Sequence, residues 1–151
     1  MEREIKHTWH FDAAPELVWE HLTQSDLIAQ WLMQNDFKLV VGHNFTFSTR
    51  PMKAFGFDGK VYCQVMEVVP LKRLIYTWKG GSGGGKVSLD SVVTWTLTPK
   101  DNGTELQLVH AGFKGIKNFM AYISMNAGWG SKIIGRLKEM VNTAKNDIAA
   151  H

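Results

Sequence analysis

The stretch V-T-W-T-L-T-P-K-D-N-G-T-E-L-Q-L-V-H, residues 93–110, decides the fold class of this chain. Apolar residues stand at every second position on both sides of a D-N-G turn, a pattern typical of two antiparallel strands with one buried face. Pro99 is expected to end the first strand, because proline cannot donate to a ladder. His110 lies on the apolar side of the second strand. The stretch therefore predicts a β-hairpin that covers a core.

The same alternation of apolar and polar residues recurs along the chain. The sequence predicts further strands over residues 4–11, 37–41, 45–47, 60–70 and 74–78, with a Gly42-His43-Asn44 turn between the second and third of these. Six or seven strands joined by short turns indicate one antiparallel sheet.

Helical patterns occur in two places. Two short helices are expected between residues 13 and 32, the first with Pro15 in its opening turn. In the C-terminal third, residues 117–123 are expected to form a short helix and residues 126–148 a long one with a single apolar face. The long helix is the one large apolar surface left to cover the sheet. The predicted fold is therefore α+β, a curved antiparallel sheet wrapped around a long C-terminal helix.

Length and composition indicate one domain over residues 1–151. The apolar fraction is 44% and the charged fraction 21%, both ordinary for a globular protein. A single cysteine, Cys63, excludes an intramolecular disulfide and a cysteine-based metal site, and fits a reducing cytoplasm. The sequence contains no signal-peptide pattern and no apolar run that would span a membrane. The net charge of +3 is scattered, so neither nucleic acid nor a membrane is an expected partner, and no cofactor is predicted.

Five ordered motifs carry a family resemblance. They are F-D-A-A-P-E-L-V-W-E-H-L-T (11–23), V-G-H-N-F-T-F (41–47), C-Q-V-M-E-V-V-P-L-K-R-L-I-Y-T-W (63–78), the hairpin with its continuation to residue 113, and G-W-G-S-K-I-I-G-R-L (128–137). Together they resemble the START-like, or SRPBCC, superfamily, and more narrowly the family of the activator of the ninety-kilodalton heat-shock-protein ATPase. The resemblance implies a helix-grip fold with space for a ligand between sheet and helix. Some relatives bind hydrophobic small molecules, some resemble polyketide cyclases, and the eukaryotic namesake stimulates a chaperone.

A glycine loop, G-G-S-G-G-G-K over residues 80–86, matches the G-x-x-x-x-G-K spacing of nucleotide-binding loops. Such a loop needs Ser or Thr after the lysine to hold magnesium, and here Val87 follows. It also needs a helix after the glycines, whereas the residues after Val87 read as a strand. The prediction is a connection between two strands.

Other catalytic or metal-binding patterns are weak. His7 and His10 are three residues apart on a predicted strand, so their side chains point to opposite faces and cannot share an ion. No G-x-S-x-G motif occurs, and no nucleophile, base and acid arrangement can be read from the sequence. The sequence therefore predicts no metal site and no catalytic residue.

His110 is the polar residue of interest on the apolar face. Two interpretations stay open: a hydrogen-bonded core histidine, with Glu67 or Asp90 as conceivable partners, or a polar anchor for a ligand. The tryptophans likewise serve either core packing or a cavity. The expected ligand-binding wall, named below as the aromatic wall, consists of Trp9, Phe47, Val65, Trp78, Trp95, His110, Trp129 and Ile133.

The leading hypothesis is a monomeric or homodimeric protein that binds a small, largely hydrophobic molecule at the aromatic wall. One alternative is a co-chaperone-like interaction domain, with Lys132, Arg136, Lys138 and Lys145 facing an acidic chaperone partner. Another is a small cyclase- or hydratase-like enzyme that uses His110 and bound water in the same cavity.

Overall fold

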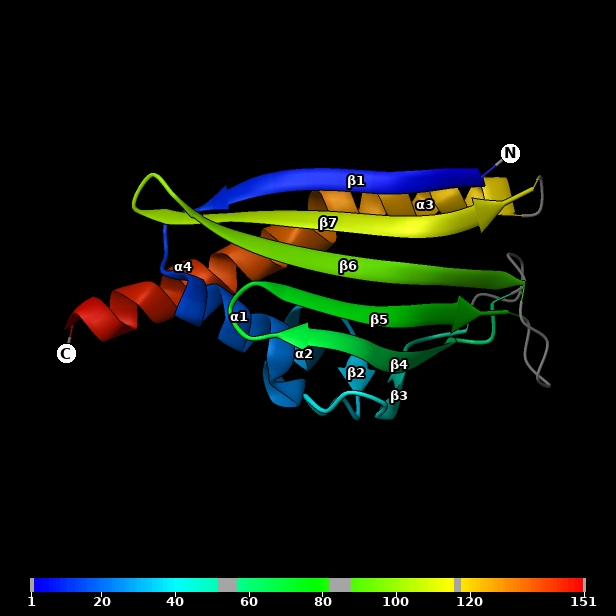
Figure 1. Cartoon of the computed structure of the whole chain (residues 1–151), viewed down its shortest axis with the longest axis horizontal. Coiled ribbons are helices and arrows are strands. Elements are labelled where there is room, and N and C mark those ends of the chain that lie inside the picture. The colour runs from blue at the N-terminus through cyan, green and yellow to red at the C-terminus, as the bar shows by residue number, and fades with distance from the viewer. Residues whose placement is uncertain (1, 52–56, 82–87, 116–117, 151) are drawn as a thin grey trace.

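A computed structural model describes residues 2–51, 57–81, 88–115 and 118–150. Seven strands form one curved, fully antiparallel sheet in the order β1-β7-β6-β5-β4-β3-β2 (Figure 1). The strands are β1 (Glu2–Phe11), β2 (Gln34–Asn35), β3 (Asn44–Ser48), β4 (Lys60–Val69), β5 (Arg73–Gly80), β6 (Leu89–Lys100) and β7 (Gly103–Lys114).

Helices cover one face of the sheet. After β1 the chain runs through α1 (Pro15–Thr23) and α2 (Ser25–Trp31) to the opposite sheet edge, where β2 begins. The C-terminal helix consists of α3 (Phe119–Gly128), the π-helical segment η3 (Trp129–Ile133) and α4 (Ile134–Ala150), which follow one another without a break (Figure 1). Both α1 and α2 pack against α4. The predicted helix-grip fold is confirmed.

The core lies between the sheet and the helices, on the face that the alternation predicted. In β6, Val93, Trp95 and Leu97 are buried, while the side chains between them lie toward solvent. The largest fully buried side chains include Trp31 from α2 and Trp129 from η3. Strand parity therefore placed the core face correctly.

The hairpin turn has the backbone that its sequence predicts. Asp101 and Asn102 both have positive φ, 52° and 62°, as a tight turn between twisted strands requires. Pro99 does not end β6, as the sequence suggested, because pairing with β7 continues to Lys100. Pairing between β5 and β6 stops at Thr96, so no β5 residue lies opposite Pro99. The ladder therefore requires no N–H from Pro99 on that side.

Two element predictions were wrong. Residues 37–41 form no strand: Phe37 is buried, but Leu39 and Val41 are exposed, and after β2 sheet pairing resumes only beyond them, where Gly42 N–H donates to the Val65 carbonyl. The strand prediction failed because a loop that contributes only one side chain to the core can show the same alternation of apolar residues. The short and long C-terminal helices are in fact one helix that begins at Phe119, because residues 124–125, which were expected to separate them, lie inside α3, and α3 continues into η3 and α4.

The glycine loop connects neighbouring strands, as predicted. β5 ends at Gly80 and β6 begins at Leu89, and these two residues are paired across the ladder. The residues after the loop form a strand, so the helix that a phosphate-binding loop requires does not follow it. Residues 82–87 themselves, with Gly85 and Lys86, lie outside the described residues.

Gly112 on β7 is a position where glycine is required. Its φ is +116°, and a Cβ there would lie 2.8 Å from the Asp90 carbonyl oxygen and 2.9 Å from the Ser91 Cα. Because both backbone strain and a backbone clash follow, Gly112→Ala is expected to lower the free energy of unfolding by about 3 kcal/mol. Urea denaturation checks this, with Gly135→Ala as control, since a Cβ at Gly135 meets nothing within 4 Å. Equal stability of the two variants would contradict the prediction.

Candidate functional site

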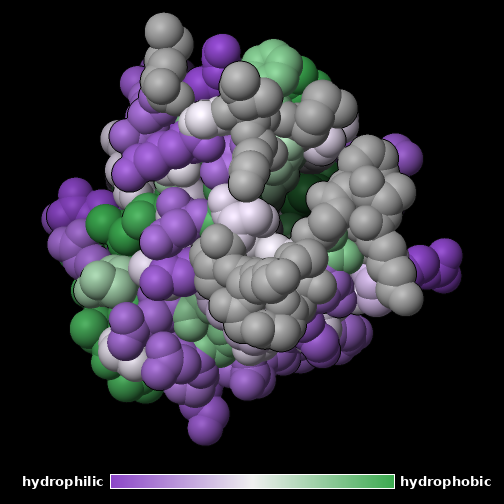
Figure 2. All heavy atoms as spheres, turned by 90° about the vertical axis from the view of Figure 1, so that its right-hand side faces the viewer, coloured by the Kyte–Doolittle hydropathy of each residue, from purple (hydrophilic) through white to green (hydrophobic). Residues whose placement is uncertain are grey.

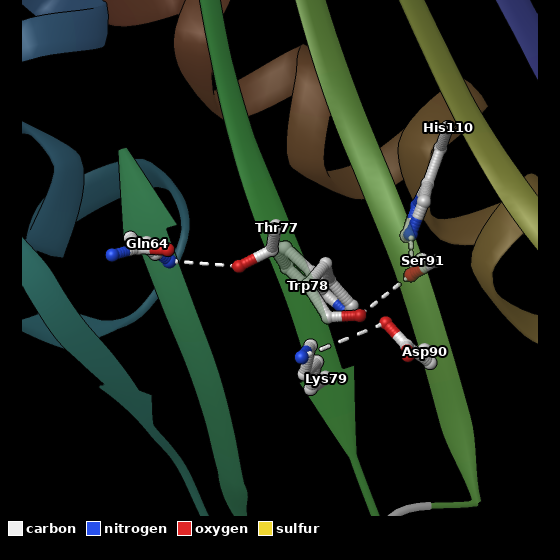
Figure 3. A network of polar contacts seen from close by, with 7 residues as sticks. All are labelled: Gln64, Thr77, Trp78, Lys79, Asp90, Ser91 and His110. Carbon is white, nitrogen blue, oxygen red and sulfur yellow. Dashed lines mark hydrogen bonds and ion pairs between the residues drawn. The ribbon is translucent and has the colours of Figure 1, made fainter. Parts of the chain in front are cut away.

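A hydrogen-bonded chain centred on His110 crosses the interface between the sheet and the C-terminal helix. Trp129 Nε1 lies 3.1 Å from His110 Nδ1, and His110 Nε2 lies 2.8 Å from Ser91 Oγ. Ser91 Oγ in turn lies 2.7 Å from the Trp78 carbonyl oxygen (Figure 3). The chain thus links η3 to β7, β6 and β5.

The partners fix the protonation of the His110 ring. An indole N–H can only donate, so Nδ1 accepts and the hydrogen sits on Nε2. Nε2–H then donates to Ser91 Oγ, whose own hydrogen goes to the Trp78 carbonyl. Burial lowers the pKa of His110 from 6.5 to about 3, because a charged ring would lose its hydration there. His110 is therefore a neutral imidazole with both ring nitrogens bonded.

Aromatic rings surround this chain of bonds. The Trp129 ring centroid lies 5.6 Å from that of Trp78 and 5.6 Å from that of Trp95, both at steep interplanar angles. Phe113 packs 4.7 Å from the His110 ring. Edge-to-face rings at these spacings contribute packing energy beyond the area they bury. The site is consequently a tightly packed aromatic cluster around one neutral histidine.

The aromatic wall predicted from the sequence divides into two groups. Trp9 on β1 and Ile133 on η3 are half-buried at the rim. The other six members are between 0 and 3% exposed and all lie on the core face: Phe47, Val65, Trp78, Trp95, His110 and Trp129. Whether these residues contact a ligand stays a prediction.

The two histidines that were predicted to point to opposite faces of the sheet, His7 and His10, do so. His7 faces the helix and His10 faces solvent, which confirms the predicted parity. The His7 Nε2 lies 2.8 Å from Asn126 Oδ1, and its ring stacks on Trp9. A Cβ at Gly130 would lie 3.0 Å from the His7 ring. Because Gly130 has no side chain, the His7 ring of β1 can pack directly against the helix there.

The partners of His110 differ from those considered from the sequence. Glu67 pairs with Arg73 on the exposed surface, and Asp90 lies 4.0 Å from Lys79, also exposed (Figure 3). Ser91 was missed, although it falls on the inner face in step with Val93 and is 1% exposed. Strand parity was a signal that could have found it.

Helix α3 is apolar but incompletely covered. No Lys, Arg, Asp or Glu occurs between Asn118 and Ser131, yet none of the α3 side chains that the structure describes is fully buried. Phe119 is 40% and Ile123 45% exposed. Figure 2 looks onto the end of the molecule where β5 and β7 end, and strongly hydrophobic atoms lie set back in a hollow on this face. Apolar surface of this kind is typical of binding sites.

Arg3 holds the start of α3 against the sheet. Its guanidinium lies 4.9 Å from the Phe119 ring centroid and 5.7 Å from that of Tyr122. Cation–π contacts at partly exposed positions contribute about 0.5–1 kcal/mol each. This end of α3 is thus attached by side-chain contacts rather than by deep burial.

Other reactive groups are scarce in the described part of the chain. Burial raises the pKa of the Cys63 thiol, so it stays protonated and a poor nucleophile. No group of three or more histidine, cysteine or acidic side chains suited to a metal occurs among the described residues. Likewise, no described helix is both long and apolar enough to cross a membrane.

The basic residues considered for a chaperone partner are largely engaged within the chain. Lys145 pairs with Asp12 at 3.1 Å, and Lys138 lies over the Phe11 ring. Arg136 donates from Nε to the Trp31 carbonyl at 3.2 Å. These contacts spread three of the four positive charges over different neighbours, and Lys132 is exposed.

Comparisons with known proteins identify a family and solved structures that share this architecture. The family described as Activator of Hsp90 ATPase homolog 1-like protein matches residues 12–142. Protein MLL2253 from Mesorhizobium loti is 35% identical, with 93% of this chain and 98% of that one covered and a TM-score of 0.82. Protein BH1534 from Bacillus halodurans is 30% identical, with 92% and 96% covered and a TM-score of 0.70.

A more distant likeness concerns the Aha1 dimer from Colwellia psychrerythraea, which is 21% identical, with 92% and 96% covered and a TM-score of 0.72. At that identity the likeness shows the fold alone. None of the curated proteins compared matches the chain. The family match over most of the chain agrees with the helix-grip sheet and the helix that it holds. This chain belongs to the family of Activator of Hsp90 ATPase homolog 1-like proteins.

Proposed function

We propose that this chain binds a small, largely hydrophobic molecule between the curved sheet and the C-terminal helix, against the aromatic wall. The observation that carries the proposal is α3, a helix without charged residues whose described side chains are at most half-buried. A helix that is apolar all round is normally buried or covered by something else. A ligand between α3 and the sheet would cover the half-buried side chains that face the core, among them Ala121, Tyr122 and Met125.

The polar partner for such a ligand follows from the bonds of His110. Its Nδ1 accepts from Trp129, the first residue of η3. π-helical turns are often found at functional sites, where the backbone is least regular. A ligand that replaces the Trp129 indole must also donate, so a hydroxyl or N–H group fits this position. The ligand class supported best is an apolar, ring-sized molecule with one hydrogen-bond donor.

Native mass spectrometry of gently purified protein is the first test. A mass above that of the chain, lost on denaturation and recovered by extraction, would identify the ligand class. Weakly bound molecules are lost during purification, so the second test measures binding of a defined probe.

The probe is anilinonaphthalenesulfonate, a dye that fluoresces on apolar protein surfaces. Ala121 is half-buried on the core side of α3, whereas Ala127 on the same helix is exposed. We expect Ala121→Trp to weaken dye binding by about tenfold, since the added ring occupies the space of the ligand. Ala127→Trp, with the same change in composition, should leave binding unchanged. Circular dichroism checks that both variants keep the native fold.

Two results would contradict the proposal. One is a wild-type protein that does not enhance dye fluorescence at all. The other is an equal loss of binding in the Ala121→Trp and Ala127→Trp variants, which would place the dye on the outer surface of the helix.

A further inference from the structure

A second concave site lies on the helical side of the molecule, away from the His110 chain. Helices α1, α2 and α4 enclose an open groove with a volume of about 400 Å³, within the range of small-molecule sites. Its apolar part is formed by Leu27 of α2 and by Met140 and Ala144 of α4, all half-buried. The hydrophobic site proposed above does not include this groove.

His21 of α1 gives the groove a buried polar group. The side chain is 4% exposed, and its Nδ1 lies 2.9 Å from the Leu17 carbonyl oxygen. A carbonyl only accepts, so Nδ1 carries a hydrogen, and in that tautomer of the imidazole Nε2 is the acceptor. Nε2 has no hydrogen-bond partner among the described residues, and no described side-chain nitrogen or oxygen is both sealed from solvent and unpartnered. His21 lines the groove, and its Nε2 is not sealed from solvent.

Two carboxylates lie along the α4 wall of the groove, Glu139 and Asp147. They are eight residues apart, which corresponds to about 12 Å along a helix. Arg136 also lines the groove, but its Nε donates to the Trp31 carbonyl at the C-terminal end of α2. The α4 wall therefore presents two separated negative charges, and the guanidinium of Arg136 is hydrogen-bonded to the C-terminal end of α2.

The helices opposite α4 add to this negative character. Residues 12–37 contain no Lys or Arg, although the chain as a whole has a net charge of +3. The same segment contains five carboxylates: Asp12, Glu16, Glu20, Asp26 and Asp36. The helices opposite α4 therefore bring no lysine or arginine to the groove, whose lining carries the carboxylates of Glu139 and Asp147 and the guanidinium of Arg136.

We propose that this groove binds a linear aliphatic polyamine. Its two ammonium ends pair with Glu139 and Asp147, and its methylene chain lies on Leu27 and Met140. An amine N–H between the ends donates to His21 Nε2. A polyamine supplies only donors and apolar surface, which matches a groove that offers an acceptor, two carboxylates and an apolar floor.

Isothermal titration of the full chain with spermidine at low ionic strength tests this site. Glu139→Gln combined with Asp147→Asn is expected to weaken binding by about tenfold, because two partly exposed ion pairs are lost. The control combines Glu16→Gln with Glu20→Gln, which changes the net charge equally at exposed α1 positions outside the groove. Its affinity should stay within about twofold of wild type. Propylamine, with one ammonium group, should bind about tenfold more weakly than spermidine.

Three results would overturn the proposal: no heat of binding for spermidine with the wild-type chain, an equal loss in the two double variants, or equal affinity for propylamine. An equal loss would mean attraction by net charge alone. Spermidine should also leave the fluorescence of dye bound at the aromatic wall unchanged. The polyamine site can therefore fail or hold independently of the hydrophobic site.

Discussion

Replacing Trp129 with alanine is expected to lower the free energy of unfolding by about 4 kcal/mol. The side chain is 1% exposed and packs against Trp78 and Trp95, so its removal leaves a large void between sheet and helix. The same change removes the donor to His110 Nδ1. A buried ring nitrogen without a partner adds its own cost, since it has lost both water and its protein partner.

Trp129→Phe separates these two effects. Phenylalanine keeps most of the ring packing but has no N–H, so the expected loss is about 1–2 kcal/mol. Urea denaturation followed by circular dichroism measures both variants, and Lys132→Ala, at an exposed position of η3, should change stability by less than about 0.5 kcal/mol. A Trp129→Phe variant as stable as wild type would mean that the bond to His110 contributes nothing to stability.

The sheet was largely predictable because its information is local. Alternation in β6 and β7 placed Val93, Trp95 and His110 on the core face, and the Asp101-Asn102-Gly103 sequence determined the turn. Each of these features depends on a few neighbouring residues and on the pleat of a strand. The closure of the sheet around a helix followed from one further step, because the long C-terminal helix was the one large apolar surface left to cover the sheet.

Long-range pairings limited what could be predicted about the site. The donor to His110 comes from Trp129, nineteen residues further along the chain, and its position depends on the unbroken course of α3, η3 and α4. Glycines within a helical pattern indicate that something approaches the helix closely, and at Gly130 it is the His7 ring. The pattern alone could not say which residue approaches, because the contact is made by a strand at the other end of the chain.

Stability is also expected to depend on pH through His110. Burial lowers the pKa of His110 in the folded protein to about 3, from 6.5 for an exposed ring. Between these values the unfolded chain binds a proton that the folded protein does not. The free energy of unfolding is therefore undiminished above pH 6.5 and falls with decreasing pH, by about 1.4 kcal/mol per pH unit, until about pH 3. Between pH 7 and pH 5 the expected loss from this one group is about 2 kcal/mol.

The measurement is a series of urea denaturation curves at pH 7, 6 and 5 on wild type and on His110→Gln. Glutamine retains a donor and an acceptor but does not titrate in this range, so the variant keeps every other titrating group and loses only the His110 contribution. The variant should be less stable than wild type at pH 7 and should show a shallower pH dependence, by about 2 kcal/mol over the series. Parallel curves for the two proteins would contradict the lowered pKa of His110 in the folded protein.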